Sequence, residues 1–245
     1  MQHNLKIAKT YLVHGLIAHF ACVILMVNLR PAVAQEVPGK SDEERVGRHA
    51  AGRTVTPVNQ ILTPIGQQVE LPGMRPQALA LSPDRTILVT AGKTSEIVAI
   101  DPQSGSIKQR VALPSESSSV GPQPPVSEQV LQPDEEGQLS YTGLIFSPSG
   151  KRIYMSNVDG SIKVFAVSEG GEIAPNGSFK LPPANAPRRD AEIPSGLAIS
   201  VDESKLYVCG NLSNRLIEID TKTGKTLRTF DVGVAPYDVV LVNGK

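Results

Sequence analysis

The stretch that decides the fold runs from residue 193 to residue 232 and reads IPSGLAISVDESKLYVCGNLSNRLIEIDTKTGKTLRTFDV. Two other stretches can be laid over it: RPQALALSPDRTILVTAGKTSEIVAIDPQSGSIKQRVAL at 75–113 and SYTGLIFSPSGKRIYMSNVDGSIKVFAVSEGGE at 140–172. Leu79, Leu144 and Leu197 occupy the same place in the three copies, and Val239 takes that place in a fourth. The chain is therefore built from a repeat.

Each copy holds short β-rich runs that are separated by turn residues. Ser82-Pro83-Asp84 and Asp202-Glu203-Ser204 follow the first run of their copies, and Pro, Asp, Ser and Gly all favour turns. A β-sandwich would also give short strands at regular spacing, but it does not explain why strands and turns recur in the same order. Four antiparallel strands per copy, at a period of roughly 40 to 50 residues, predict the blades of a β-propeller.

Three passages carry a resemblance to a known family: LYVCGNLSNRLIEIDTKTGKTL, IYMSNVDGSIKVF and LSPDRTILVTAGKTSEIVAID. They resemble the YVTN β-propeller repeat, whose signature is a Tyr-Val-x-Asn strand, a strand ending in Ile-Asp, and a Thr-Gly-Lys turn. The match covers about Val69 to Lys245, although the first copy lacks the Tyr and the Asn. The chain has no Trp, so the Trp-Asp signature of WD40 propellers is absent. The resemblance implies seven blades.

The repeats predict an all-β fold, an incomplete β-propeller of about three to four blades out of a probable seven. We expect blades at about 75–113, 139–181 and 192–232, with the start of a further blade at 234–245. Asn243-Gly244 is a strong signal for a hairpin turn, yet only Lys245 follows it, and a strand at about Gln67–Leu71 resembles the last strand of a blade. We therefore expect a longer chain or another copy to supply the remaining blades.

The N-terminal residues 1–34 have the pattern of an export signal. A basic start is followed by a mostly apolar run and by Ala32-Val33-Ala34, where cleavage would leave Gln35 first. The alternative is an uncleaved membrane anchor, for which the run is shorter than the roughly 20 residues that a span requires. We expect a periplasmic or secreted protein with a disordered tether at 35–56 and the partial propeller at 57–245.

Composition argues against several classes of function. Lys and Arg total 24 and Asp and Glu total 24, which does not favour nucleic acid, and contact with a membrane is expected only through the export signal. After cleavage the chain keeps one His, His49, and one Cys, Cys209, so no Ser-His-Asp or Cys-His pair has a base on the fold. There is no glycine-rich phosphate loop and no His/Cys metal spacing, so we expect no catalytic residue, no cofactor and no metal.

The candidate ligand-binding residues lie in the loops of one rim. The first strand of a blade is innermost, so blade-to-blade connections share a rim with the turns between second and third strands, and insertions there often mark a binding face. The long connections are Pro114–Gln138 and Pro182–Glu192. The candidates, for an anion in the case of the two arginines and for a cation in the case of the others, are Arg188, Arg189, Asn157, Asp159, Asn211 and Asn214. Solvated arginines and turn-forming Asn and Asp are the alternative explanation.

The sequence therefore favours an exported binding or scaffold module without catalytic residues in this segment, whose partner is an unknown small molecule or protein at the rim. One alternative is a lactonase-like propeller enzyme, which would need ligands for a metal at the inner strands. Those strands begin with Gln77, Tyr141-Thr142, Ser195 and Tyr237, which carry no carboxylate. Another alternative is the substrate-positioning part of a longer hydrolase, because exported propellers of this type resemble the N-terminal half of proteins with an alkaline-phosphatase-like phosphoesterase domain.

Overall fold

The structure is a computed structural model that describes residues 45–49, 52–58, 60–115 and 134–242 of the chain. The chain divides into two compact units, Met1–Ile65 and Gly66–Lys245, which are described separately here. The predicted export segment 1–34 and most of the connection 114–138 lie outside the described residues. Within the described ranges, no helix is long and apolar enough to cross a membrane.

The first unit contains a small antiparallel sheet in the order β1 (Gly47–Arg48), β2 (Thr54–Val55) and β3 (Ile61–Leu62). Both β1 and β2 lie within 35–56, the range for which the sequence predicts a disordered tether. The boundary at residue 57 also differs from the structure, because β3 belongs to this sheet and the second unit begins at Gly66. Strands of two residues carry no period that a sequence pattern could reveal.

Over its described residues, the second unit contains three four-stranded antiparallel sheets, which confirms the predicted blades. Each sheet keeps its strands in sequence order, as a propeller blade does. Blade 1 is β4 (Pro76–Leu81), β5 (Leu88–Gly92), β6 (Glu96–Ile100) and β7 (Ile107–Ala112). Blade 2 is β8 (Leu139–Phe146), β9 (Arg152–Asn157), β10 (Ser161–Val167) and β11 (Ile173–Lys180). Blade 3 is β12 (Pro194–Ile199), β13 (Lys205–Gly210), β14 (Arg215–Asp220) and β15 (Thr226–Asp231).

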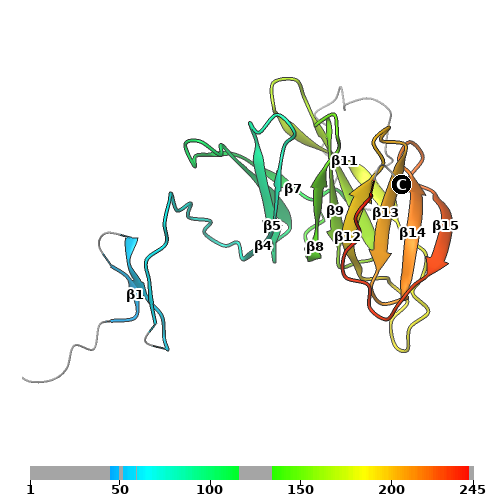
Figure 1. The fold of residues 1–245 in the computed structure, drawn as a ribbon, viewed down its shortest axis with the longest axis horizontal. Coiled ribbons are helices and arrows are strands. Elements are labelled where there is room, and N and C mark those ends of the chain that lie inside the picture. Colours follow the sequence, from blue (N-terminus) through cyan, green and yellow to red (C-terminus); the bar gives the residue numbers. More distant parts are fainter. Residues whose placement is uncertain (1–44, 50–51, 59, 116–133, 243–245) are drawn as a thin grey trace, which may run out of the picture. The chain divides into compact units, whose positions relative to one another are not determined.

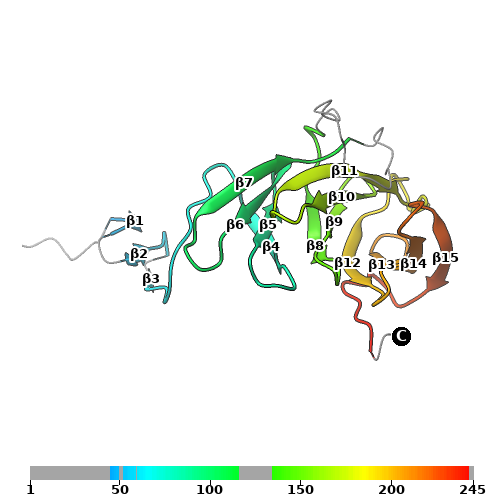
Figure 2. The same cartoon turned by 90° about the horizontal axis from the view of Figure 1, so that it is seen from above.

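The blades follow one another with their first strands adjacent. β8 packs against both β4 and β12, and β7, β11 and β15 form the opposite edges of the sheets (Figures 1 and 2). Two rims result. The connection rim carries the blade-to-blade connections and the turns between second and third strands. The hairpin rim carries the turns between first and second strands and those between third and fourth strands.

Apolar side chains fill both junctions between blades. In β9, Ile153 and Met155 belong to the core shared with blade 1, whereas Tyr154 belongs to the core shared with blade 3. This alternation is the period of two of a β-strand. Leu144 is buried between blades 1 and 2, but Leu79, at the same place in the repeat, is 66% exposed because no preceding blade occurs among the described residues.

The turns form as the sequence predicts. The Ser82 hydroxyl donates to Asp84 Oδ1 over 2.6 Å, and Asp84 also accepts the Thr86 amide over 3.1 Å. Between the third and fourth strands, Gly105 and Gly224 adopt positive φ of 68° and 69°. Only glycine adopts this left-handed backbone without steric strain, so the two glycines explain why the turn recurs.

The two ends of the second unit are irregular. The strand predicted at Gln67–Leu71 does not form; instead Val69 and Leu71 pack with Met74 against the outer face of blade 1. The predicted strand at 234–245 does not form over its described residues either, although Tyr237 O accepts the Gly196 amide over 2.8 Å. Each segment contacts a blade, but among the described residues neither has a further sheet to join, and without ladder partners a strand is not stable.

Candidate functional site

The connection rim brings together loops that are distant in sequence. Asn157 ends β9 and Asp159 lies in the turn between β9 and β10, and the turn between β13 and β14 holds Asn211 and Asn214. The connection between β11 and β12 contains Arg188 and Arg189. Backbone hydrogen bonds join these loops, since the Leu181 amide donates to Gly160 O over 3.0 Å and the Asn211 amide donates to Ile193 O over 3.1 Å.

The two arginines do not form a clamp in which both guanidinium groups are free. Arg189 Nε donates to Ala191 O over 3.0 Å, and its Nη2 donates to Val158 O. Arg189 therefore holds its own connection against the turn between β9 and β10. Arg188 is exposed and has a positive φ of 69°, which matches a strained loop position. The guanidinium of Arg189 is thus already hydrogen-bonded to backbone carbonyls, and Arg188 is the exposed arginine of this loop.

Asn157 and Asp159 belong to a polar network that the sequence did not predict in full. Buried Asn157 accepts the Gln138 amide over 2.8 Å and donates to Asp134 over 3.3 Å. Lys163, which is fully buried in β10, lies 2.7 Å from Asp134 Oδ2 and 3.2 Å from Asp159 Oδ2. The only sequence signal was a lysine between Ile162 and Val164, at the centre of an apolar strand.

This network lowers the pKa of Asp134. Partial burial alone would raise the pKa, but the hydrogen bond and the positive charge of Lys163 outweigh burial, and the Gly137 amide and Asn157 add to their effect. The carboxylate thus stays ionised beside the buried lysine. Because loss of the carboxylates would leave the buried Lys163 ammonium without a counter-charge, the ion pairs hold the end of the 114–138 connection in place, and Asn157 and Asp159 have structural partners here.

Asn211 and Asn214 fix the segment that follows blade 3. Asn211 Nδ2 donates to Pro236 O over 3.1 Å, and Asn214 Oδ1 accepts the Ala235 amide over 2.8 Å. Asn214 also has a positive φ of 58°, a conformation that Asn tolerates better than most residues. Both side chains therefore have the local backbone role that the sequence left open as the alternative.

Glu192 is a buried rim residue that sequence analysis named only as the end of a connection. Its Oε1 accepts the amides of Ile193, Leu212 and Ser213 over 2.9, 2.9 and 3.3 Å. Its Oε2 has no hydrogen-bond partner in the described part of the chain, and the same holds for Ser213 Oγ. The carboxylate therefore organises the turn that carries Asn211. No sequence pattern pointed to it, because a Glu in a loop is usually solvated.

The inner ends of the blades, where β4, β8 and β12 begin at the connection rim, share a backbone irregularity. The strand register shifts between Pro76 and Ala78, between Leu139 and Leu144, and between Pro194 and Leu197. Such bulges redirect side chains and are frequent near binding sites. The shifts include the inner-strand positions Gln77, Tyr141, Thr142 and Ser195.

Two tyrosines stand at this inner edge. Tyr141 and Tyr237 are 40% and 53% exposed, and their rings meet edge to face with centroids 5.6 Å apart. The Tyr141 hydroxyl donates to Asn211 Oδ1 over 3.2 Å, and Tyr141 has a positive φ of 51°. A bulky residue in this conformation is strained, and such strain is concentrated at functional sites. We call Tyr141, Tyr237 and Asn211 the inner-edge site.

Candidates for chemistry are few in the described residues. Among them, no group of three or more His, Cys, Asp or Glu side chains could hold a metal ion. Cys209 is buried, and burial, together with the charge of Asp238, raises the pKa of its thiol to about 11. A thiol with so high a pKa is a poor nucleophile at neutral pH.

Comparison with known proteins identifies the fold. No protein-family model matches the chain, and no curated protein matches it. Among solved structures, the chain is similar to the periplasmic gluconolactonase PpgL of Pseudomonas aeruginosa, with 19% identity, a TM-score of 0.51, and coverage of 71% of this chain and 44% of that chain. It is also similar to the β-propeller domain of Cps50 (Swd1) from Myceliophteria thermophila, with 10% identity, a TM-score of 0.50, and coverage of 78% and 55%.

These similarities define the class of protein as a β-propeller. At such low identity they show the fold alone. The chain spans about half the length of the two solved structures, 44% of one and 55% of the other. The described blades are thus a propeller module, and the role of the module has to be argued from its own residues.

Proposed function

We propose that this chain is part of an exported β-propeller binding module of the YVTN type, and that it binds a small polar ring compound at the inner-edge site. The observation that carries the proposal is the exposed pair of Tyr141, in β8, and Tyr237, in the segment that follows blade 3. Tyrosine rings offer an apolar surface with a polar tip, and a few convergent polar groups fix the orientation of a ligand.

The inner-edge site has a hydrogen-bonding group at the tip of the Tyr141 ring, because Asn211 Oδ1 accepts a hydrogen bond from the Tyr141 hydroxyl. Gln77 and Thr142 are further exposed polar residues in the bulged inner strands. A sugar-like ring suits such a site, because it has apolar faces and a rim of hydroxyl groups. The similarity to a protein named as a gluconolactonase adds support for a ring of this class. We favour binding without chemistry, since none of the inner-strand positions named above carries a carboxylate.

Titration with D-glucono-1,5-lactone tests this proposal. The chain contains 5 Tyr and no Trp, so intrinsic fluorescence reports tyrosine directly. We expect a saturable change that is weakened by Tyr237→Ala and Tyr141→Phe and kept by the control Tyr207→Phe, which lies in β13 away from the inner edge. If all variants bound the lactone equally well, the inner-edge site would be rejected as its binding site. Hydrolysis of the lactone above the buffer rate would reject binding without chemistry.

We also propose that residues 1–34 direct export and that the module acts in the periplasm or outside the cell. The basic start, the apolar run and Ala32-Val33-Ala34 support this assignment. Expression of the full chain in a bacterial host, followed by N-terminal sequencing of the periplasmic fraction, tests it. A mature chain that begins at Gln35 is the expected result, and retention of Met1 with the membranes would contradict cleavage.

A further inference from the structure

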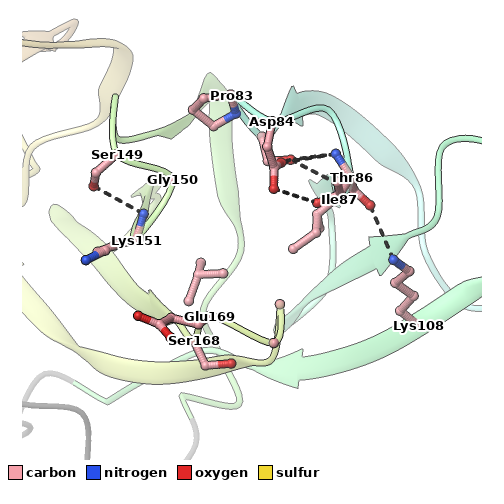
Figure 3. Close-up of a pocket in the computed structure, with 14 residues that line it drawn as sticks. Pro83, Asp84, Thr86, Ile87, Lys108, Ser149, Gly150, Lys151, Ser168 and Glu169 are labelled. Carbon is pink, nitrogen blue, oxygen red and sulfur yellow. Dashed lines mark hydrogen bonds between the residues drawn. The ribbon is translucent and has the colours of Figure 1, made fainter.

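The hairpin rim has a cleft of about 570 Å³ between blades 1 and 2 (Figure 3). Its volume lies within the range of about 300 to 1,000 Å³ that is common for small-molecule sites. The cleft lies between the first turns of both blades and the last turn of blade 2. It is lined by Ser82, Pro83, Asp84, Thr86, Ile87, Lys108, Ser149, Gly150, Lys151, Val167, Ser168, Glu169, Gly170 and Gly171.

The junction between blades 2 and 3 is bridged at the equivalent place. Arg152 of blade 2 donates from Nη1 to Thr221 O of blade 3 over 3.2 Å. In addition, Glu203 of blade 3 accepts the Ser149 amide of blade 2 through its carboxylate. Two side chains thus cross this junction at the hairpin rim and occupy the space between the turns.

The strand register identifies the residues that replace this bridge at the cleft. Leu81 pairs with Leu88 as Phe146 pairs with Ile153, so Ile87 takes the position of Arg152. Ser147 and Ser200 begin equivalent turns, closed by bonds to Arg152 O and Lys205 O, so Gly150 takes the position of Glu203. The cleft is open because an isoleucine and a glycine stand where the other junction has an arginine and a glutamate.

Two of the four charged residues that line the cleft already have partners. Asp84 accepts hydrogen bonds from Ser82 and Thr86, and Lys108 donates to Thr86 O over 3.3 Å and pairs with Asp101 over 3.5 Å. In the part of the chain that the structure describes, the side chains of Lys151 and Glu169 make no hydrogen bond or ion pair. In Figure 3 these two lie on one side of the cleft, and Lys108 lies on the other side.

The cleft therefore has one ammonium group, that of Lys151, and one carboxylate, that of Glu169, without partners among the described residues, and apolar side chains also line it. Ile87 lines the cleft with the small part of its side chain that is exposed, 4%, and a Cβ added at Gly171 in the last turn of blade 2 would lie 3.2 Å from its Cδ1. Pro83 and Val167 add apolar surface. A ligand that satisfies all three features needs a carboxylate, an ammonium group and an apolar part.

We propose that this cleft binds a free α-amino acid with an apolar side chain. The α-carboxylate pairs with the Lys151 ammonium, the α-ammonium pairs with the Glu169 carboxylate, and the side chain lies over Ile87. Hydrogen bonds between charged groups are stronger than those between neutral groups, so loss of either charge weakens binding strongly. The site lies on the rim opposite the inner-edge site and is independent of the function proposed there.

Isothermal titration calorimetry of the full chain with L-leucine tests the proposal. N-acetyl-leucine lacks the ammonium charge and leucinamide lacks the carboxylate, so each should bind at least about tenfold more weakly than L-leucine. Failure of L-leucine to bind at millimolar concentration would overturn the proposal. Equal binding of all three compounds would also overturn it, because charge recognition at both ends is its central claim.

Variants of the chain locate the site. Lys151→Ala and Glu169→Ala change exposed residues, and each should weaken L-leucine binding at least about tenfold. The matched control is Lys222→Ala, which changes an exposed lysine in the last turn of blade 3 and should leave binding unchanged. Ile87→Arg should abolish binding by filling the cleft as Arg152 fills the other junction, with circular dichroism as the check on folding. Unchanged binding by the double variant Lys151→Ala/Glu169→Ala would reject this cleft.

Discussion

Lys163 Nζ lies 2.7 Å from the carboxylate of Asp134, and none of the lysine side chain is exposed. Asp159 is the second partner at 3.2 Å. This pairing joins the end of a long connection to the third strand of blade 2. It links two loops of the connection rim by ion pairs, and it pairs a fully buried ammonium group with two carboxylates that are 16% and 30% exposed.

Removal of both carboxylates should destabilise the fold strongly. The double variant Asp134→Asn/Asp159→Asn leaves the ammonium of Lys163 buried without a counter-charge, at a cost of about 3 to 5 kcal/mol of unfolding free energy. Urea denaturation measures the loss. Asp190→Asn, an exposed aspartate in the next connection, is the control and should change stability by less than about 0.5 kcal/mol. A double variant as stable as the control would contradict the anchor.

Gly143→Ala should also destabilise the protein, because blades 2 and 3 approach closely at that glycine. A Cβ at residue 143 would lie 2.1 Å from both Ser195 O and Ser156 Oγ. Relief of these contacts requires the inner strands to separate, with an expected cost of about 1 to 3 kcal/mol or more. Gly170→Ala is the matched control, since the nearest atom to its new Cβ would be Ser168 Oγ at 3.7 Å. Thermal unfolding of both variants checks the difference.

The lowered pKa of Asp202 predicts that the protein loses stability in acid. The Ser200 hydroxyl, followed by the amide and hydroxyl of Ser204, lowers the pKa of Asp202 from 3.8 to about 2. Because the pKa is depressed in the folded state, the stabilisation is complete above the ordinary value of 3.8 and is lost as the pH falls through about 2. Titration of the Asp202 carboxyl carbon by NMR should show this pKa. Ser200→Ala should raise the pKa, and an unchanged value would exclude the hydroxyl as its main cause.

Cys209 should react slowly with thiol reagents in the native protein. With a thiol pKa of about 11, only about one molecule in a thousand carries a thiolate at pH 8. The measurement uses Ellman's reagent on a Cys22→Ser variant, with and without urea. Asp238→Asn should speed the reaction, because it removes the negative charge that adds to the effect of burial. Fast modification in the native state would contradict the burial of Cys209.

The sequence predicted the blades well because the apolar residues that recur at the same place in each copy are the residues that neighbouring blades bury. Leu144 and Leu197 recur at the same place and both are buried at a junction between blades. The sequence could not predict the partners of Lys163 or the role of Glu192, since both depend on loops that meet only after the blades stack. It placed Asn211 and Asn214 on the connection rim. A sequence alone does not distinguish an Asn that stabilises a turn from an Asn that binds a ligand, and both side chains bond to the backbone here.

The hydroxyl of Ser156 donates to Ser195 O over 2.7 Å, and this bond crosses from blade 2 to blade 3 at the inner edge. The strands β7, β15, β8 and β12 all have a sheet partner on one side only, but β8 and β12 also pack against each other across the junction between blades 2 and 3. Hydrogen exchange should therefore be slower for the amides of β8 and β12 than for those of β7 and β15. Local opening of each blade would then begin at its outer edge, and separation of neighbouring blades would require the concerted breaking of the inner bonds. The inner edge is thus the part of the module best able to keep a fixed geometry while the loops around it move.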